Sequence, residues 1–371
     1  MRRYCRRAVC ALSLLMGMAL LTGCAGPRLC FTPEEAAAYA PFASPREIRI
    51  LTVNVWSGLT YEGTLKVGRY ADRPEKRYEA LAAQIRELAP DIIAIQEANP
   101  LPDYAERLAA DLDYRVVYGV ALGGVRLGPV GLPWNLREGN ALLVRKPWTV
   151  VEVAKARLDG WGIVTNWFCF HFVETTQALM CRAVVNGKPA YICNVHLHSG
   201  PFHGPAFDDA LARLARELTE NAVADARQRA EEDMARRHAE LANLNRFLGE
   251  TLPPRTPAVL LGDFNTTSES GELDALLAGG KWLDSFRSVN PDAEGQTWDP
   301  VHNPNIGVQG PTPDPYGLLC AYHERHPSRV DLVLLANIPR ERISRSRVVL
   351  TPRSDGLCAS DHYGVLTTLM W

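Results

Sequence analysis

The sequence has no excess of positive charge, no closely spaced cysteine pair, no internal repeat and no long Gly/Ser linker. It carries 40 Lys and Arg against 42 Asp and Glu, a formal net charge of −2. Nonspecific nucleic-acid binding depends on Lys and Arg contacts to phosphates, so this balance argues against a general polyanion-binding protein. None of the nine cysteines has Cys-x-x-Cys spacing, which argues against a zinc site.

An apolar run over residues 8–21 follows four arginines and is shorter than the roughly 20 apolar residues that a membrane-spanning helix needs. This pattern predicts a signal peptide over residues 1–23. The run ends in Leu-Thr-Gly-Cys24, which resembles the bacterial lipobox, so we expect an exported protein whose Cys24 is acylated and anchors it to the membrane. Ala25 follows in place of Asp, which predicts the outer membrane of the cell envelope.

Removing residues 1–23 would take away four arginines and no acids, leaving 36 basic against 42 acidic residues. Residues 24–45 are rich in Pro and Ala and are expected to form a tether. One domain is predicted over residues 46–371. Six further cysteines could form disulfides in an exported protein: Cys30, Cys169, Cys181, Cys193, Cys320 and Cys358.

Strands and helices alternate along this domain, beginning with a strand, a helix and a strand that form a crossover unit. An Asn-Gly pair at residues 186–187 predicts a hairpin. Residues 119–139, rich in Gly and apolar side chains, are expected to form a loop that folds back on the domain or contacts lipid. Strands are predicted over 46–56, 91–97, 141–145, 149–155, 179–185, 190–196, 258–261, 331–335 and 365–370, and helices over 73–88, 207–248 (one long or two joined) and 268–277.

Polar residues with catalytic chemistry stand at the ends of several of these strands. Asp263 and Asn265 follow a buried strand, and their spacing can place a carboxylate beside a carboxamide. Glu97 repeats the pattern of a buried strand that ends in an acid, and Asn54 interrupts an otherwise apolar strand. Each alone is compatible with an ordinary turn or a hydrogen-bonded core amide. Ligands bind at the carboxyl ends of buried parallel strands, which favours a shared site.

Two histidine motifs complete the set of candidate residues. His196 and His198 alternate at a strand end; we interpret His196 as an acid-base or phosphate-contacting group and His198 as a surface histidine. Asp361 and His362 form a compact acid-base pair just before the last strand, and Asp331 begins an apolar strand. The stretches 297–300 and 303–305 are interpreted as turns among prolines and glycines.

Taken together, these motifs resemble the endonuclease/exonuclease/phosphatase superfamily over about residues 46–371. The resemblance implies an α/β (α+β) fold, a four-layer sandwich of two mixed β-sheets packed face to face and flanked by helices. It is carried by six motifs in the family's order: Asn54, Gln96-Glu97, Asn194-Val-His196, Gly262-Asp263-Phe-Asn265, Arg329-Val-Asp331 and Ser360-Asp361-His362.

The same resemblance implies a site for Mg²⁺ or Mn²⁺. Glu97 would be the main metal ligand, with Asn54 and Asp361 assisting. His362 would be the general base, oriented by Asp331. In the remaining implied roles, Asp263 would align the attacking water or contact the metal, Asn265 would donate to a phosphate oxygen, and His196 would donate to the phosphate or the leaving group.

The expected activity is divalent-metal-dependent hydrolysis of a phosphodiester in the cell envelope, by a monomer. The Trp298-Asp299-Pro300 turn, the strand that Asp331 begins and the apolar loop after Tyr118 resemble the neutral sphingomyelinase branch, which implies a phospholipid or sphingomyelin-like substrate. An acidic, lipid-anchored chain fits such a substrate. A secreted nuclease is the main rival interpretation, because Arg126, Arg137 and Arg145 could line a site. An inositol-phosphate phosphomonoesterase and a catalytically inactive binding lipoprotein are also compatible with these motifs.

Overall fold

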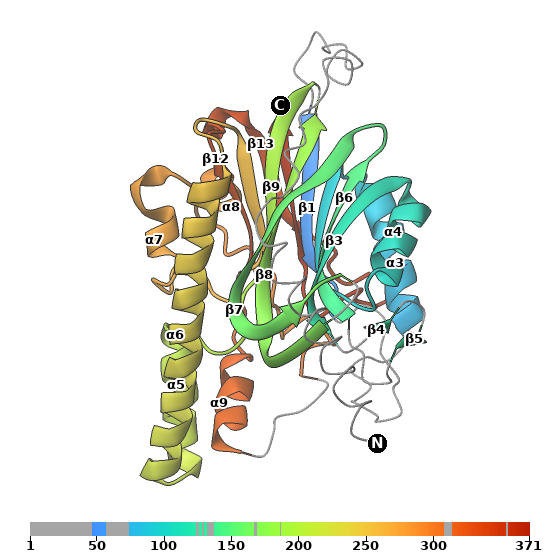
Figure 1. Ribbon diagram of the computed structural model, residues 1–371. Helices are drawn as coiled ribbons and strands as arrows, with labels where there is room; N and C mark the ends of the chain where they lie inside the picture. Colours follow the sequence, from blue (N-terminus) through green and yellow to red (C-terminus); the bar gives the residue numbers. More distant parts are fainter. Residues whose placement is uncertain are drawn as a thin grey trace, which may run out of the picture. The chain divides into compact units, whose positions relative to one another are not determined.

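Two six-stranded sheets packed face to face form the centre of the computed structural model (Figure 1). The structure describes residues 47–56, 74–123, 126–127, 130–131, 137–166, 169–185, 187–307, 314–353 and 355–371. The predicted signal peptide, the tether and Cys24 lie outside these residues. No helix among the described residues is both long enough and apolar enough to cross a membrane.

The first sheet has the chain's earliest and latest strands at its centre. β1 pairs in parallel with β2 and antiparallel with β14, so the sheet is mixed. In spatial order it contains β13 (Ile343–Val349), β14 (Gly364–Met370), β1 (Glu47–Asn54), β2 (Ile92–Ala98), β6 (Arg137–Arg145) and β3 (Tyr114–Gly123).

The second sheet repeats this arrangement, with β10 parallel to β9 and antiparallel to β12. Its outer strands β7 and β8 form a ribbon that continues beyond the end of β9. In spatial order it contains β11 (Leu283–Asp284), β12 (Asp331–Ala336), β10 (Ala258–Asp263), β9 (Lys188–His196), β8 (Cys169–Val185) and β7 (Thr149–Val164); β4 (Arg126–Leu127) and β5 (Val130–Gly131) pair separately.

The helices add two outer layers. α3 (Pro74–Leu88) and α4 (Asp103–Leu112) cover the first sheet, whereas α6 (Glu220–Thr251) and α7 (Asp274–Leu277) cover the second (Figure 1). The short elements are η1 (Ala278–Gly280), α8 (Ser285–Val289) and η2 (Arg340–Arg342).

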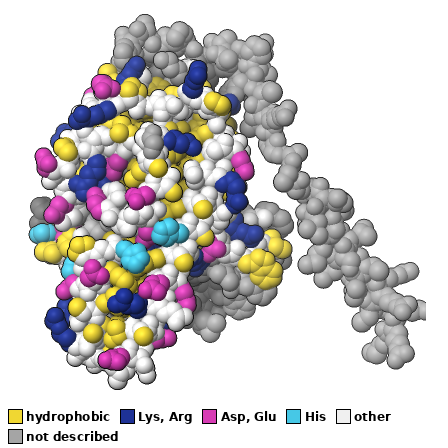
Figure 2. All heavy atoms as spheres, turned by 90° about the vertical axis from the view of Figure 1, so that its left-hand side faces the viewer, with side chains coloured by type: hydrophobic (Ala, Val, Ile, Leu, Met, Phe, Trp, Pro, Cys, Tyr) yellow, Lys and Arg dark blue, Asp and Glu magenta, His cyan; other side chains and the backbone are white. Residues whose placement is uncertain are grey.

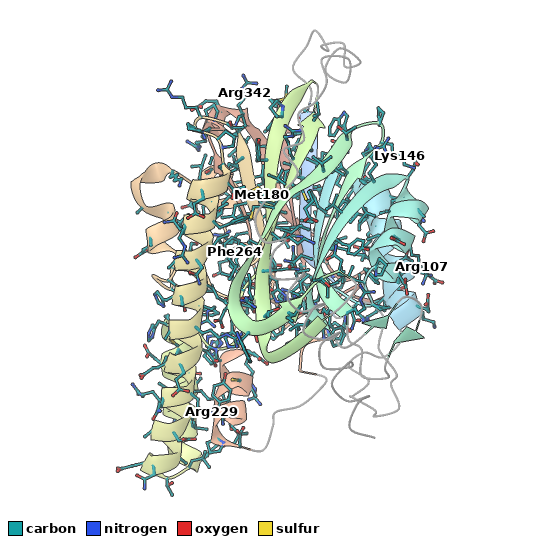
Figure 3. All side chains as sticks on the ribbon, viewed as in Figure 1. Arg107, Lys146, Met180, Arg229, Phe264 and Arg342 are labelled. Carbon is teal, nitrogen blue, oxygen red and sulfur yellow. The ribbon has the colours of Figure 1, made fainter. Side chains whose placement is uncertain are left out.

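Apolar side chains fill each gap between layers. Ile50, Leu142, Val259 and Val365 belong to the cluster between the two sheets, and each is at most 1% exposed. Met180 and Phe264 pack in the gap beneath α6, while Arg107 and Lys146 lie at the surface, where they pair with Glu75 and Asp113 (Figure 3). Alternating side chains along a strand face opposite layers, so one buried strand supplies two cores at once.

A separate helical unit stands beside one end of the sheets. It consists of α5 (Pro205–Glu217), the first half of α6, and α9 (Pro315–His323), which share their own apolar cluster. α5 has Pro at its first turn, where a missing backbone N–H costs nothing. This unit forms one wall of the site described below.

The predicted four-layer sandwich is confirmed, and so are the crossover unit and the hairpin between β8 and β9. The region 207–248 consists of two helices, because α5 ends at Glu217 and α6 begins at Glu220. The ribbon strands β7 and β8 are much longer than predicted. β7 and β8 continue to pair with each other beyond the residues at which β8 pairs with β9.

Several predictions of local structure were wrong. Residues 119–139 are not all loop, since β3 runs to Gly123 and β6 starts at Arg137. The helix predicted over 268–277 is only the four residues of α7, because Gly271 takes a positive φ of 82° and the Ser270 hydroxyl accepts from the Glu272 backbone N–H. α4, α8 and α9 were not predicted.

The cysteines do not support the disulfide prediction within the described part of the chain. Cys181, Cys193, Cys320 and Cys358 are all free thiols. Burial raises the pKa of Cys181 and Cys193, as expected for cysteines that act as small apolar core residues.

The core between the sheets can be tested with one matched pair of substitutions. Val259 is 1% exposed and Val301 is 70% exposed. We expect Val259→Ala to lower the free energy of unfolding by about 2 kcal/mol, through lost apolar burial and a residual cavity. Val301→Ala should change it by less than about 0.5 kcal/mol. Urea denaturation followed by circular dichroism measures both, and equal effects would contradict the proposed core.

Candidate active site

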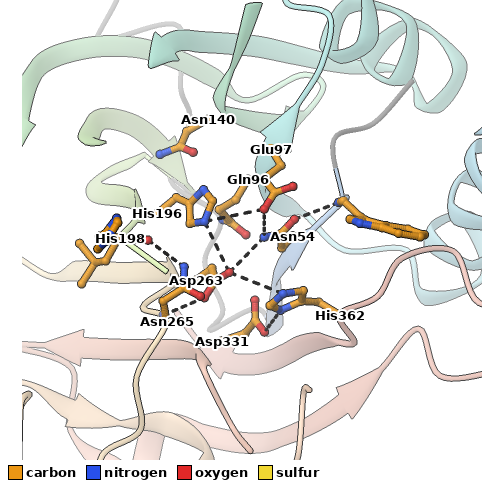
Figure 4. Close-up of polar contacts among 12 residues, drawn as sticks. Asn54, Gln96, Glu97, Asn140, His196, His198, Asp263, Asn265, Asp331 and His362 are labelled. Atoms are coloured by element: carbon orange, nitrogen blue, oxygen red, sulfur yellow. Dashed lines mark hydrogen bonds and ion pairs between the residues drawn. The ribbon is translucent and has the colours of Figure 1, made fainter. Parts of the chain in front are cut away.

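The polar strand ends identified in the sequence meet at one edge of the sandwich. In the sheet registers, Asn54 lies beside Gln96, and Asp263 lies between His196 and Asp331. A cleft of about 410 Å³ lies at this edge, and its lining includes Glu97, His196, Asp263, Asp361 and His362. Side chains from both sheets and from the loop before β14 therefore face one space (Figure 4).

A buried amide pair joins the two sheets beneath this cleft. Gln96 of β2 donates to the Asn194 side-chain oxygen of β9 over 2.7 Å. Asn194 in turn donates to the backbone carbonyls of Ile95 and Ala141, at 3.0 and 2.9 Å. Both side chains are 0% exposed, so a fully bonded polar link fixes one sheet relative to the other.

Gly262 explains how Asp263 reaches the cleft. Its φ of 142° is rarely adopted by residues with a side chain, and a Cβ there would overlap the carbonyl oxygen of Val195 on β9. β10 thus lies tightly against β9 one residue before the carboxylate. Asp263 is 1% exposed, and its Oδ1 accepts from the Asn265 backbone N–H over 2.8 Å.

Asn54 stands between two carboxylates. Its Nδ2 donates to Glu97 Oε1 over 2.9 Å and to Asp263 Oδ2 over 3.0 Å, while its Oδ1 accepts from the Trp56 backbone N–H. In this orientation Asn54 offers donors, not an oxygen, to the space between the two acids. For Asn54 to act as a metal ligand, its carboxamide would have to flip so that Oδ1 faces the two acids. This role stays a prediction.

His362 and Asp331 form a buried dyad. His362 Nδ1 lies 2.9 Å from Asp331 Oδ2, and His362 Nε2 faces Asp263 Oδ2 at 3.7 Å, too far for a direct hydrogen bond. Burial lowers the pKa of His362, but the charges of Asp331 and Asp263 outweigh it and raise that pKa well above its ordinary value. The raised pKa favours the imidazolium while the neighbouring acids carry their full charge; if a cation offset that charge, Asp331 could keep the remaining proton on His362 Nδ1 and leave Nε2 free toward the cleft.

Asp361 lies beside the dyad in the same acidic environment. Burial raises its pKa to about 7, and the charge of Glu97 adds to this effect. Ser360 donates to Asp361 Oδ1 over 3.1 Å and also to the Asn54 backbone carbonyl over 2.7 Å. Asp361 is therefore tied to β1 and faces the side of the cleft that holds Glu97.

His196 and Asn265 complete the opposite wall. His196 Nε2 lies 3.9 Å from Glu97 Oε1 and 3.7 Å from Asp263 Oδ2. Asn265 uses one amide N–H on the Leu197 carbonyl over 2.7 Å, and its carboxamide carries a second. His198, interpreted as a surface histidine, is instead largely buried, since its side chain is 18% exposed and its Nε2 pairs with Asp233 at 2.7 Å.

Several residues that support the site escaped sequence reasoning. Arg77 is 3% exposed, stacks on the Trp56 ring and donates to the backbone carbonyls of Trp56 and Ala359. Its charge lies near Asp361 and Glu97. The sequence did contain one signal: Arg77 lies on the apolar face of the helix predicted over residues 73–88, where an arginine is unusual.

The stretches 297–300 and 303–305, interpreted from the sequence as turns, also support the site. The Thr297 hydroxyl accepts from the Asp331 backbone N–H over 3.1 Å, and the Trp298 ring packs on the His362 ring at 5.1 Å. Asn303 donates to the carbonyls of Ser360 and Asp361 over 3.0 and 2.8 Å. These loops therefore fix both members of the dyad and the adjacent acid.

The residues present fit a divalent cation. Glu97, Asp263 and Asp361 offer carboxylate oxygens around one cleft, the donor type that Mg²⁺ and Mn²⁺ prefer. Burial raises the pKa of Asp361, the charge of Glu97 adds to this effect, and a bound cation would offset both. Asp263, Asp331 and His362 also bring ligand atoms within 4.8 Å of one another, but a cation there would compete with the bond between His362 and Asp331. The Glu97 side is therefore the better candidate.

The arginines proposed for a nuclease groove do not gather at this cleft. Arg145 lies at the opposite end of β6 and pairs with Asp91 at 3.3 Å, so its placement at the site was wrong. Arg137 is 5% exposed at the near end of β6. The side chain of Arg126 lies outside the described residues. The described lining of the cleft contains no Lys or Arg.

The two-sheet sandwich and the polar residues at its strand ends together define a class of phosphoester hydrolases. Residues 51–362 match the Endonuclease/Exonuclease/phosphatase family, and the chain belongs to that family. The members of the family hydrolyse phosphoester bonds and typically use a divalent metal. No curated protein matches the sequence.

Solved structures share the fold at low sequence identity. A family protein from Bacteroides thetaiotaomicron has a TM-score of 0.53 and 15% identity, covering 88% of this chain and 98% of its own. TDP2 from Caenorhabditis elegans has a TM-score of 0.51 and 16% identity, covering 93% and 82%. TDP2 from D. rerio, complexed with a single-strand DNA product, has a TM-score of 0.51 and 16% identity, covering 87% and 98%.

Metal binding should depend on pH through Asp361. Because its pKa is raised to about 7, a proton competes with the metal below that pH and not above it. We expect Mn²⁺ to bind about tenfold more tightly at about pH 8 than at about pH 6, measured by calorimetry. Asp361→Asn should weaken Mn²⁺ binding and reduce its dependence on pH. Asp292 is exposed, and Asp292→Asn should change neither the affinity nor its pH dependence. Equal affinity at both pH values would remove Asp361 from the ligand set.

Proposed function

We propose that the protein is a divalent-metal-dependent phosphodiester hydrolase. The observation that carries this proposal is the buried dyad of His362 and Asp331, which faces Asp263 and His196 across a cleft bordered by Glu97. A general base, an orienting carboxylate, a donor on the far wall and a cluster of oxygen ligands are the parts that in-line attack of water on phosphorus requires.

Each residue takes a role from its position. His362 Nε2 accepts the proton of the attacking water, while Asp331 holds the ring through Nδ1 and stabilises the imidazolium. Asp263 Oδ2 lies 3.7 Å from His362 Nε2 and also from His196 Nε2, where it can align that water. Glu97 and Asp361 would hold a divalent cation, Mg²⁺ or Mn²⁺ by their donor type, and that cation would supply charge stabilisation for the phosphate oxygens.

The other wall serves the phosphate and the leaving group. His196 Nε2 donates to a phosphate or leaving-group oxygen, and the second amide N–H of Asn265 donates to a phosphate oxygen. Attack by the water oxygen breaks the bond between phosphorus and the leaving oxygen, which then takes a proton. These donors lie on the side of Asp263 opposite His362, as in-line displacement requires.

The charge of the cleft favours a lipid phosphodiester over a nucleic acid or an inositol polyphosphate. Its described lining has carboxylates and histidines but no Lys or Arg to meet a second phosphate. Burial lowers the pKa of His323, one of the lining histidines, to about 4, so it is neutral. On the face that α5 and α6 cover, acidic and basic side chains are interspersed (Figure 2). A polyanionic substrate would therefore gain little favourable binding energy at this cleft.

Apolar exposure supports a lipid substrate as well. Trp161 and Ile163 are 63% and 55% exposed on the part of β7 that extends beyond β9. β9 ends at His196, so this ribbon projects on the same side of the sandwich as the cleft. A phospholipid or sphingomyelin-like substrate in the cell envelope, reached by a monomer that Cys24 anchors to the outer membrane, fits these features.

Removing the proposed general base should greatly lower turnover and leave the fold intact. We expect His362→Ala to lower kcat by roughly 10²- to 10⁴-fold, because proton removal from water then has no acceptor. His203→Ala is the matched control, since His203 is exposed and does not line the cleft. Turnover of bis(p-nitrophenyl) phosphate with Mn²⁺ measures both variants. A His362→Ala enzyme with more than half of the original kcat would assign the base elsewhere.

A substrate panel tests the lipid assignment. The protein would be offered sphingomyelin and lysophospholipid in detergent micelles, single-stranded and plasmid DNA, and inositol phosphates, each with Mg²⁺ or EDTA. We expect metal-dependent cleavage of the lipids at a kcat/KM at least about tenfold above that of the DNA and inositol phosphates, since one phosphate suffices for the cleft. Preferential cleavage of DNA would favour a nuclease, that of inositol phosphates a phosphomonoesterase, and no turnover would favour a binding lipoprotein.

A further inference from the structure

One stripe of α6 carries three charged side chains that turn toward the site instead of toward solvent. Asp233, Arg237 and Glu240 are spaced by four and three residues, which places them on one face of the helix. Arg237 and Glu240 are 0% exposed, and the Asp233 side chain is 19% exposed. All three contact the segment 197–201, which directly follows His196 at the end of β9.

Asp233 and Glu240 both hold His198. Glu240 Oε2 accepts from the His198 backbone N–H over 2.8 Å, and Glu240 Oε1 accepts from the Thr176 hydroxyl over 2.7 Å. Asp233 Oδ1 pairs with His198 Nε2 at 2.7 Å. The Tyr316 hydroxyl of α9 donates to the second carboxylate oxygen of Asp233, which links the stripe to the helix on the far wall of the cleft.

Arg237 holds the carbonyl groups that follow. Its Nη1 donates to the carbonyls of His198 and Gly200, at 3.4 and 3.3 Å, and its Nη2 donates to the carbonyl of Pro201. Glu272 balances its charge through two hydrogen bonds of 2.8 and 3.0 Å. An irregular segment cannot satisfy its own backbone groups, so this guanidinium replaces the missing strand partner.

The same segment is fixed from its opposite side by the end of β10. The Leu197 backbone N–H donates to the Asp263 carbonyl over 3.0 Å, and Asn265 donates to the Leu197 carbonyl over 2.7 Å. The segment is thus gripped between β10 and α6. It starts directly after His196 and continues into Ser199, Gly200, Pro201 and Phe202, which line the cleft.

We propose that Asp233, Arg237 and Glu240 are positioning residues that set the place of His196 and of the cleft wall beside it. Burying charged groups is costly unless each is paired, and here each is paired with the backbone or side chain of one short segment. A displacement of about 1 Å in a catalytic group can cost roughly 10²-fold in rate, so this grip matters for turnover. The inference rests on the proposed hydrolase activity.

Asp233 gives the cleanest test, because its partial exposure lets the fold tolerate its loss. Asp233→Ala removes the partner of His198 and of Tyr316 at once. Glu232→Ala is the matched control on the same helix, since Glu232 is exposed and its carboxylate accepts a hydrogen bond from Gln228 one turn earlier. Both would be combined with His196→Ala, and kcat and KM would be measured with bis(p-nitrophenyl) phosphate and Mn²⁺, well below the unfolding midpoint.

We expect Asp233→Ala to lower kcat by about tenfold in the native background and by less than about twofold beside His196→Ala, because two residues that act through one group are not additive. Asp233→Asn should recover part of the loss by keeping one acceptor oxygen. Glu232→Ala should leave kcat unchanged in both backgrounds. An equal loss in both backgrounds, or no loss, would overturn the proposal.

A second measurement does not depend on turnover. In ¹⁵N-histidine spectra, the His196 ring signals, assigned by their absence in His196→Ala, should move in Asp233→Ala and stay in place in Glu232→Ala. Unmoved signals would overturn the positioning role. If the wild-type protein hydrolyses no phosphodiester but the ring signals move, the proposed function fails and the positioning of His196 stands.

Discussion

The hydrogen bond between Gln96 and Asn194 is the constraint on which the site depends. The candidate catalytic side chains come from the strands of both sheets and from the loops that adjoin those strands, so chemistry across the cleft requires the two sheets to keep their relative position. An apolar interface alone permits sliding, because dispersion contacts have no direction. A buried amide pair that also binds the carbonyls of Ile95 and Ala141 has a single satisfied geometry. It therefore converts two packed sheets into one rigid support.

The electrostatics of the cleft follow from the same convergence of strand ends. Bringing Glu97, Asp263, Asp331 and Asp361 together is unfavourable, and the molecule offsets this with neutral or positive groups placed behind or between them. Asn54 separates two of the acids, His362 takes up charge beside two more, and Arg77 acts from the helix behind. The remaining negative charge faces the cleft, where the cation that the family typically uses can bind.

The sequence was informative where function and secondary structure coincide. Asp263, Glu97 and His196 each end a buried strand, a position with a local signal, and the family resemblance supplied their grouping. The supporting residues have no such signal. Asn303 and Arg77 act on backbone carbonyls that are distant in the chain, and α6 grips the segment after His196 through contacts that only packing creates. The short helices between residues 278 and 323 are set by tertiary contacts, which override weak local propensity.

The position of β1 has a consequence for how the enzyme matures. β1 lies between β2, its near neighbour in sequence, and β14, the last strand of the described chain. Until β14 arrives, β1 presents an unpaired edge and His362, just upstream of β14, cannot meet Asp331. Such long-range pairing is slow. His362, the proposed general base, can therefore reach Asp331 only once the last described strand has docked, so the candidate site is assembled at the end of folding.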